Sequence, residues 1–576
     1  MKSSLVLIFT LVFVQLFAQN NAIMGTKDTL TYSYYSGGVF DSVDIAFTTH
    51  SSTLPGGGFS KNENVLPYNF YIQNNGGAIY NQFNDWKKMR FSALPHLGFG
   101  YVFGTQATQV VKASYAQAFN SQTLLNVDYD MHKGKNFMRA GDFGKHDVQL
   151  QFEFQSRFYS LGVKGQFVSR NIAQNDGLLV DSLIDYYGLS FAPIRKENAQ
   201  SKYRGGRVEL SHYFDFLAKD SANAMGLYVD NQLRIFNRKY KEKSDTLTAI
   251  YPLIYYNADS TGDQYQLSEI VNAAGLFYSR EKLFFKVGVL NNWWNYFNLG
   301  NKIAQSEVNL DGTIGLNFKS VAFRNHTNFN LIGANREWYT YSNLDFKWKG
   351  LSLNAKANIS HLLPEQFQRF YSANNVYYNL LNGNLDKQFK LDVGGHLKYT
   401  HQQHQVGVFV NNATVSSNYW FYNNTWRNDT LKTVNAFSVG LTGRTGYKVI
   451  FFDFKGSFNK SDWMPSVLVQ GRLYVQGRLF KSKKLLAQIG VESSYRTGYK
   501  LLEHLPYMDV FNLTNVSTKP MANLHVFGGF EIQRFRFFFR VENLGYFWSD
   551  KTTRIALNQT IPSLNIRVGI TWDFYN

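Results

Sequence analysis

Apolar and polar residues alternate along the last stretch of the chain, from Pro562 to Asn576. The apolar positions are Leu564, Ile566, Val568, Ile570, Trp572 and Phe574. A period of two places all six on one face of a β-strand and the polar residues on the other. A soluble sandwich strand can show this pattern. A strand that closes a transmembrane β-barrel requires it, because one face meets lipid and the other meets water.

The same alternation recurs from about residue 91 onwards, with no helical period between the strands. Strands of this kind are predicted near 147–155, 161–167, 310–319, 351–359, 467–479 and 534–542. Short turns, such as Lys349-Gly350, mostly alternate with long polar connections near 171–202, 238–265, 291–304, 361–387, 413–432, 496–519 and 544–561. Two connections, 333–336 and 459–465, are short for outer loops. The sequence therefore predicts an all-β fold, a transmembrane antiparallel β-barrel with an even strand number of roughly 18–22.

The composition agrees with a membrane barrel and argues against other classes. Aromatic residues make up 17% of the chain, with 37 Tyr and 50 Phe, which suits a barrel with aromatic girdles at the membrane interfaces. Cysteine is absent, which excludes disulfides, thiolate catalysis and cysteine-ligated metals. The mean hydropathy is −0.29 and no internal run of 18 apolar residues occurs, so helical membrane spans are excluded.

The net charge of +18 has two interpretations. One is a basic surface that faces anionic lipid headgroups. The other is a lumen that favours anions. No basic helix, zinc-ligand spacing or recognition fold accompanies the charge, so we expect no nucleic-acid partner.

Three segments divide the chain. Residues 1–18 carry one Lys before an apolar core that ends near Ala18, as in a secretory signal peptide cleaved after that residue. A membrane anchor is the rival interpretation, but the core is short. Residues 19–90 are predicted to form an N-terminal periplasmic lead-in or a small plug, with room for the first strand. Residues 91–576 form the predicted transmembrane barrel, and export of such a barrel indicates the outer membrane of a Gram-negative cell.

Six arginines lie on the polar faces of strands late in the chain: Arg472, Arg478, Arg534, Arg536, Arg540 and Arg567. On the lipid face near the midplane each would cost roughly 2–4 kcal/mol, so we predict that they line the lumen. There they could form a structural network with carboxylates, among them Glu492, Glu531, Glu542 and Asp573. They could instead form a basic wall that selects anionic solutes, as rings of Arg and Lys do in anion pores.

No local motif points to catalysis, a cofactor or a metal. The chain has no Walker A sequence, no dinucleotide fingerprint, no H-E-x-x-H and no G-x-S-x-G. His401 and His404 have H-x-x-H spacing, but no carboxylate stands beside them, so they are weak metal ligands. We therefore expect no enzyme. An outer-membrane hydrolase stays an alternative, because the catalytic groups of a barrel come from separate strands and leave no local signature.

Several aromatic-rich strand signatures resemble the putative porin family of Bacteroidetes outer membranes. They are FSALPHLGFGY at 91–101, LPYMDVF at 505–511, RFRFFFR at 534–540 and the alternating stretch from Pro562 through Phe574. The resemblance covers most of the mature chain and implies an outer-membrane barrel that acts as a pore, with no catalytic residues to carry over. One departure is visible: such proteins typically finish on Phe, whereas here Tyr575 and Asn576 follow Phe574.

The function expected from these observations is a porin-like channel for passive diffusion of small hydrophilic solutes, with a preference for anions as a further expectation. The alternatives are a substrate-specific uptake barrel, an outer-membrane hydrolase and a surface adhesion barrel. The expected partners are outer-membrane lipid and lipopolysaccharide, small solutes, and the barrel-assembly machinery, which would bind the C-terminal strand. The sequence is compatible with an oligomer.

Overall fold

The computed structural model describes residue 83 and residues 86–575, except for 181–182, 218–222, 244–246, 248–250, 252, 281, 334–335, 382–384, 418, 423, 428–432, 462–463 and 558. The predicted signal peptide at 1–18 and most of the segment 19–90 lie outside the described residues. Among the residues described, no helix has both the length and the apolar character needed to cross a membrane.

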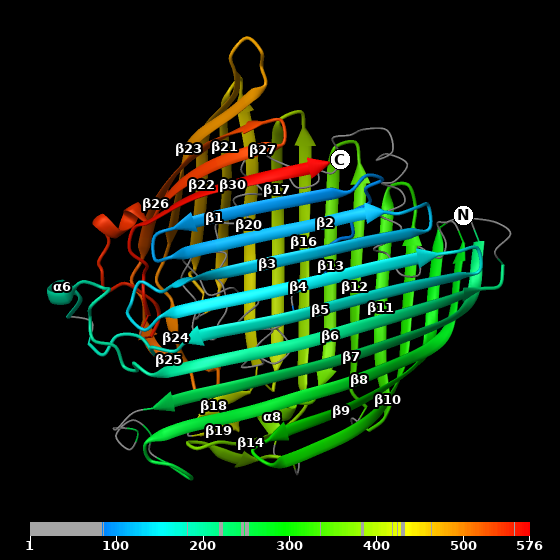
Figure 1. The fold of residues 1–576 in the computed structure, drawn as a ribbon, viewed down its shortest axis with the longest axis horizontal. Helices are drawn as coiled ribbons and strands as arrows, with labels where there is room; N and C mark the ends of the chain where they lie inside the picture. The colour runs from blue at the N-terminus through cyan, green and yellow to red at the C-terminus, as the bar shows by residue number, and fades with distance from the viewer. Residues whose placement is uncertain are drawn as a thin grey trace.

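A single sheet of 22 antiparallel strands forms the body of the molecule (Figure 1). Its strands are β1 (His96–Gly104), β2 (Thr108–Ala118), β3 (Thr123–Lys135), β4 (Asp142–Gln155), β5 (Tyr159–Ala173), β6 (Ala199–Asp215), β7 (Asn223–Lys243), β8 (Ser260–Arg280), β9 (Leu283–Asn298), β10 (Asn301–Asn317), β11 (Val321–Ile332), β12 (Trp338–Trp348), β13 (Leu351–Leu362), β16 (Gln388–His401), β17 (His404–Ser416), β20 (Thr433–Tyr447), β21 (Ile450–Lys460), β22 (Val467–Leu479), β23 (Leu485–Arg496), β26 (Met521–Ile532), β27 (Phe535–Glu542) and β30 (Asn565–Tyr575).

The sheet closes into a barrel because the first strand pairs with the last. Leu97 of β1 lies opposite Phe574 of β30, and Tyr101 lies opposite Ile570. Each remaining pair of neighbours in this sheet consists of strands that follow one another in the sheet's chain order. The apolar residues that alternate along β30 face outward, as the sequence predicts for the closing strand. The predicted fold class and even strand number are therefore confirmed.

The connections differ between the two ends of the barrel. At one end all are short, the longest being 216–222, and this end faces the periplasm by the usual rule for such barrels. At the other end lie the long connections 174–198, 244–259, 363–387, 417–432, 497–520 and 543–564. They match six of the seven predicted long loops, with boundaries shifted by a few residues.

The seventh predicted long loop, 291–304, is wrong. β9 and β10 continue through this stretch and meet in a two-residue turn at Leu299-Gly300, whose positive φ angles of 42° and 82° suit a tight hairpin. Trp294 is buried on the inner face, whereas Trp293 is exposed on the outer face. Aromatic residues on both faces hide the period of two, which is why the stretch resembled a loop.

Short elements fill the long connections at the outer end, where Figure 1 shows them gathered. They are α6 (Ile184–Tyr187), α8 (Gln366–Arg369), β14 (Phe370–Ser372), β15 (Tyr377–Asn379), β18 (Trp420–Tyr422), β19 (Thr425–Arg427), β24 (Lys500–Leu505), β25 (Val510–Ser517), η3 (Leu544–Phe547), β28 (Arg554–Ala556) and β29 (Gln559–Thr560). The largest buried hydrophobic cluster in the described chain lies here, between these elements and the inner wall of the barrel.

Candidate functional site

The hairpin of β24 and β25 reaches across the outer mouth of the barrel. It connects β23 to β26, yet it binds β6 and β7, which lie on the far side of the ring. Arg238 of β7 donates hydrogen bonds to the carbonyl oxygens of Tyr507 (3.0 Å) and Pro506 (2.5 Å). The Tyr203 hydroxyl of β6 donates to Asp509 Oδ2 at 2.7 Å. The hairpin starts from one wall of the barrel and is bound by the wall across from it, so it spans the mouth.

Asp509 is the buried anion at the tip of this hairpin. Its Oδ1 lies 3.0 Å from His504 Nε2, and its side chain is fully enclosed. Burial alone would raise the pKa of Asp509, but the hydrogen bond with His504 and the charge of Arg238 outweigh burial and hold the pKa below its ordinary value. Asp509 is therefore charged at neutral pH, and Arg238 balances it.

The connection from β13 to β16 docks beside this hairpin. The backbone N–H of Ser372 donates to Asn298 Oδ1 of β9 at 2.5 Å. The N–H of Asn374 donates to Asp263 Oδ1 of β8 at 2.9 Å. Polar side chains of the barrel wall thus satisfy backbone donors of the loop, which is the condition for burying a loop at low cost.

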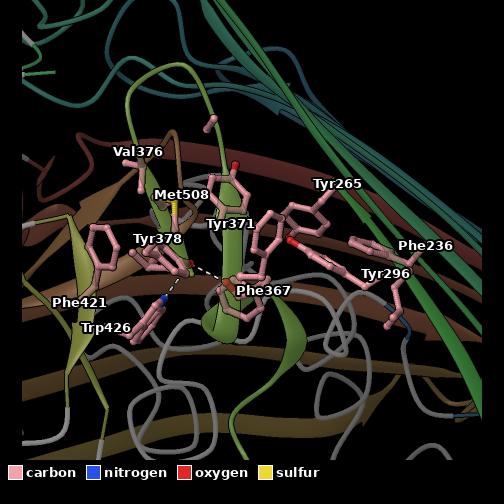
Figure 2. Close-up of a cluster of buried hydrophobic side chains, with 14 of the residues drawn as sticks. Phe236, Tyr265, Tyr296, Phe367, Tyr371, Val376, Tyr378, Phe421, Trp426 and Met508 are labelled. Carbon is pink, nitrogen blue, oxygen red and sulfur yellow. Dashed lines mark hydrogen bonds between the residues drawn. The ribbon is translucent and has the colours of Figure 1, made fainter. Parts of the chain in front are cut away.

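Aromatic side chains join the loops into one core, which we call the mouth cluster (Figure 2). The Tyr378 hydroxyl donates to the carbonyl of Phe367 at 2.5 Å, and Trp426 Nε1 donates to that hydroxyl at 3.0 Å. The cluster comprises the loop residues Phe367, Tyr371, Tyr378, Phe421, Trp426 and Met508 and the wall residues Tyr203, Phe236, Tyr265 and Tyr296. Three loops and four strands therefore share one hydrophobic core across the mouth.

A buried ion pair ties a fourth loop to the same region. Lys196, from the connection between β5 and β6, lies 3.2 Å from Glu242 of β7. The hydroxyls of Tyr240 and Tyr251 donate to the same carboxylate at 2.7 Å and 2.5 Å. Since the charge is paired and hydrogen-bonded, its burial is tolerated, but removal of either partner would leave an uncompensated charge.

The structure places four of the six predicted arginines on the inner wall. Arg536, Arg540 and Arg567 are buried there, and Arg472 is half-buried. Arg478 and Arg534 are exposed at the short-turn end. Their place in the sequence explains the difference, because Arg478 stands near the end of β22 and Arg534 stands in a turn.

The inner-wall arginines meet carboxylates that the sequence analysis named. Glu492 of β23 lies 3.3 Å from both Arg472 and Arg540. Glu542 lies 3.1 Å from Arg567 and 3.3 Å from Arg540. Arg536 lies 2.7 Å from Glu531. The geometry is that of a paired network, and the role of these arginines in lining a pore stays a hypothesis.

The described residues before β1 lie against the inner wall, and those up to residue 90 belong to the segment predicted as a periplasmic lead-in or a small plug. Trp86 Nε1 donates to Glu209 of β6 at 2.9 Å, and the guanidinium of Arg207 lies 4.0 Å from the centre of the Trp86 ring. Arg90 pairs with Asp128 of β3 at 2.7 Å. The sequence does carry a pattern that indicates this contact. An aromatic and basic segment stands just before the first strand, and β3 has acidic residues at inward positions.

The histidine pair named from the sequence lies at a short turn. His401 and His404 flank the two-residue connection between β16 and β17, and His404 Nδ1 lies 2.8 Å from Thr445 Oγ1. Within the described part of the chain, no three His, Cys, Asp or Glu side chains come together as a metal site would need.

A closed barrel with an apolar outer face, short turns at one end and long loops at the other defines an outer-membrane β-barrel protein. A family model described as "Putative porin" matches residues 91–576. The chain therefore belongs to that family and is a protein of the cell outer membrane, as the resemblance of its strand signatures implied. No curated protein matches the sequence.

Solved structures confirm the architecture at very low identity. The FrpB iron transporter from Neisseria meningitidis (F5-1 variant) matches with a TM-score of 0.58 and 8% identity over 84% of this chain and 83% of that one. The siderophore receptor PirA from Acinetobacter baumannii matches with a TM-score of 0.57 and 9% identity, over 85% and 81%. A mutant ferric enterobactin receptor from Pseudomonas aeruginosa, in complex with enterobactin, gives 0.58 and 10%, over 84% and 82%. At such identities the likeness shows the fold alone.

Proposed function

We propose that this protein is an outer-membrane channel for small hydrophilic solutes that is closed at rest by its outer loops. The observation that carries the proposal is the β24–β25 hairpin, which Arg238 and Tyr203 bind on the far side of the mouth. A barrel of 22 strands encloses a lumen wider than its own side chains fill, so its closure depends on loops or on an inner segment. The proposal includes no catalytic step.

Opening the mouth would require the loops to leave the mouth cluster. That movement exposes aromatic surface and separates the buried pairs around Asp509 and Glu242, both of which oppose it. The open state is therefore rare without a ligand, and a solute that binds better to the open loops shifts the population towards it. Such a channel is selective, unlike a permanently open diffusion pore.

A specific observation favours a second candidate, a substrate-specific uptake barrel with an internal plug. The segment around Trp86 and Arg90 lies on the inner wall, where a plug would be anchored. The structures with similar folds are described as an iron transporter and as receptors for a siderophore and for ferric enterobactin. For this chain, such a role is a proposal that rests on the inner segment.

Single-channel conductance in a planar bilayer tests the first proposal. We expect wild-type protein to open rarely, and Arg238→Met to open far more often, because the hairpin loses both carbonyl contacts. A control is Lys302→Met, which removes an exposed cation from the outer face of β10 at the same end of the barrel. A chain in which a short Gly-Ser linker replaces residues 500–517 should stay open.

Each outcome separates the candidates. Wild-type channels that are open most of the time, and unchanged in Arg238→Met, would contradict closure by the loops. Silence from the hairpin-deleted protein, when its heat-modifiable migration shows a folded barrel, would mean that the lumen is blocked elsewhere. That result would favour the plugged uptake barrel.

A further inference from the structure

Five cations gather on the outer wall of the barrel at the extracellular ends of β6 and β7. We call Lys202, Arg204, Lys239, Lys241 and Lys243 the outer basic patch. All five side chains are exposed. The residues between them, including Tyr203, Tyr240 and Glu242, are buried on the inner face, so alternation along the strands directs the five cations away from the lumen.

The register of the two strands brings the cations side by side. Lys202 lies directly opposite Lys239, Gln200 lies opposite Lys241, and Arg204 lies opposite Asn237. Paired strands are about 4.8 Å apart, and alternate residues on one strand are about 7 Å apart. Like charges directly opposite each other destabilise a sheet, so this arrangement favours an anion that neutralises both lysines.

The strand residues that face the paired lysines on either side carry no charge. On β5 the residue opposite Lys202 is Asn171, and on β8 the residue opposite Lys239 is Gln264. None of the ion pairs found among the described residues includes a cation of the patch. The nearby carboxylate of Glu197 is held by Arg139 at 2.5 Å.

The patch lies where the lipid headgroups of the outer leaflet begin. Below it, the outward residues of β7 include Met225, Leu227, Leu233 and Ile235, which are 42–45% exposed. The ten residue steps from Met225 to Ile235 rise about 25 Å at a strand tilt of about 40°, which is the height of the apolar band of such barrels. Lys239 follows four residues after Ile235, beyond the hydrocarbon layer at the long-loop end.

We infer that the outer basic patch binds the phosphate-bearing headgroup of an outer-leaflet lipid, which in a Gram-negative outer membrane is lipopolysaccharide. Clustered Lys and Arg beside a membrane-spanning segment bind anionic headgroups. The patch faces sideways at the level of the headgroups, where a lipid phosphate is held by its own acyl chains. This position favours a lipid over a free phosphate ion. The inference does not depend on the proposed channel function.

Thermal unfolding in detergent micelles tests the site. Wild-type protein and the variant Lys202→Gln, Lys239→Gln, Lys241→Gln would be titrated with bisphosphorylated lipid A, with dephosphorylated lipid A and with inorganic phosphate. The control variant, Lys481→Gln, Lys483→Gln, Lys484→Gln, makes the same charge change in an exposed turn at the periplasmic end. Lys239→Gln alone serves if the triple variant does not fold.

We expect bisphosphorylated lipid A to stabilise the wild type and the control variant equally, and dephosphorylated lipid A to stabilise neither. The patch variant should need about a hundredfold more lipid for the same rise in unfolding temperature. Each of the three cations near an anionic headgroup contributes about fivefold in affinity. Equal titrations of patch variant and wild type would overturn the site. An equal response to inorganic phosphate would overturn the assignment to a lipid.

Discussion

At the scale of single residues, Glu492 shows how charges on the inner wall are compensated. Its carboxylate lies 3.3 Å from both Arg472, on the adjacent strand β22, and Arg540, on β27, which is the second strand on the other side. Neither arginine can reach bulk solvent freely, since their side chains are 18% and 5% exposed. One carboxylate therefore compensates the charges of two arginines, and its removal leaves both charges less well compensated.

We predict that Glu492→Gln lowers the free energy of unfolding by about 2 kcal/mol, below the ~3–5 kcal/mol of a fully buried pair, because the site is partly exposed and Glu542 still binds Arg540. Urea unfolding in lipid vesicles measures the change. The control is Glu197→Gln, whose exposed pair with Arg139 should contribute less than about 1 kcal/mol. Equal losses in the two variants would contradict the special role of Glu492.

The sequence indicates which face of a strand a residue occupies wherever polar and apolar residues alternate along that strand. It placed Arg536, Arg540 and Arg567 on the inner face, and it named Glu492, Glu531 and Glu542 as available carboxylates. It had no access to Arg238, whose partners Pro506 and Tyr507 lie far along the chain in a loop without periodicity. A contact between opposite walls leaves no local pattern, so only the folded chain reveals it.

At the scale of elements, the one-turn helix α8 carries a titratable group into the closed mouth. Glu365 stands at its N-terminus, where its backbone N–H and the Gln368 side chain form a capping box. Burial raises the pKa of Glu365 from its ordinary value of 4.5 to about 7, although the charge of Lys390 acts in the opposite direction. The docked loop therefore holds a proton that the undocked loop releases.

We predict from this that docking of the connection 363–387 weakens as the pH rises. A raised carboxyl pKa means that docking is strongest below about pH 4.5, is progressively lost up to about pH 7, and changes little above that. The rate of proteolysis within the loop, measured at pH 5 to 8 and divided by the rate for Glu365→Gln, should rise up to about pH 7 and then level off. The ratio removes the pH dependence of the protease itself. A constant ratio would contradict the prediction.

Long strands could be predicted from the sequence, whereas very short ones could not. Strands that span the membrane carry enough alternation to be found from sequence, as β4, β22, β27 and β30 were. The hairpins β14–β15 and β18–β19 have strands of three residues, too short for any period to show. Their apolar residues are instead explained by the mouth cluster, a set of contacts among three loops.

At the scale of the whole molecule, the proposed channel has two candidate restrictions along its lumen. The mouth cluster spans the outer end, and the segment around Trp86 lies on the inner wall nearer the periplasm. The sequence predicted the barrel, its membrane and its range of strand number, because those follow from alternation and loop length. The sequence offered a small plug as one interpretation of residues 19–90, but it could not say which inner surfaces that segment or the outer loops contact, because those contacts join distant parts of a closed ring.

Two restrictions in series predict a particular non-additivity between variants. Trp86→Ala with Arg90→Ala removes the contacts to Glu209 and Asp128 and so loosens the inner segment, which Lys87 still binds through Asp130. Alone, this pair of substitutions should leave conductance almost unchanged, because the mouth stays closed. Combined with Arg238→Met, it should raise the conductance of each open channel above that of Arg238→Met alone, which mainly alters how often channels open.

The matched control is Trp348→Ala, which removes an exposed tryptophan from the outer face of β12 in the same Arg238→Met background. It should leave the open-channel conductance as it was. If undocking the inner segment by itself opened the channel, the mouth cluster would not be the outer restriction. If it changed nothing even with the mouth open, the segment would line the wall without narrowing the path, and the plugged uptake barrel would lose its support. Non-additive coupling is therefore the signature that distinguishes two restrictions in series from one.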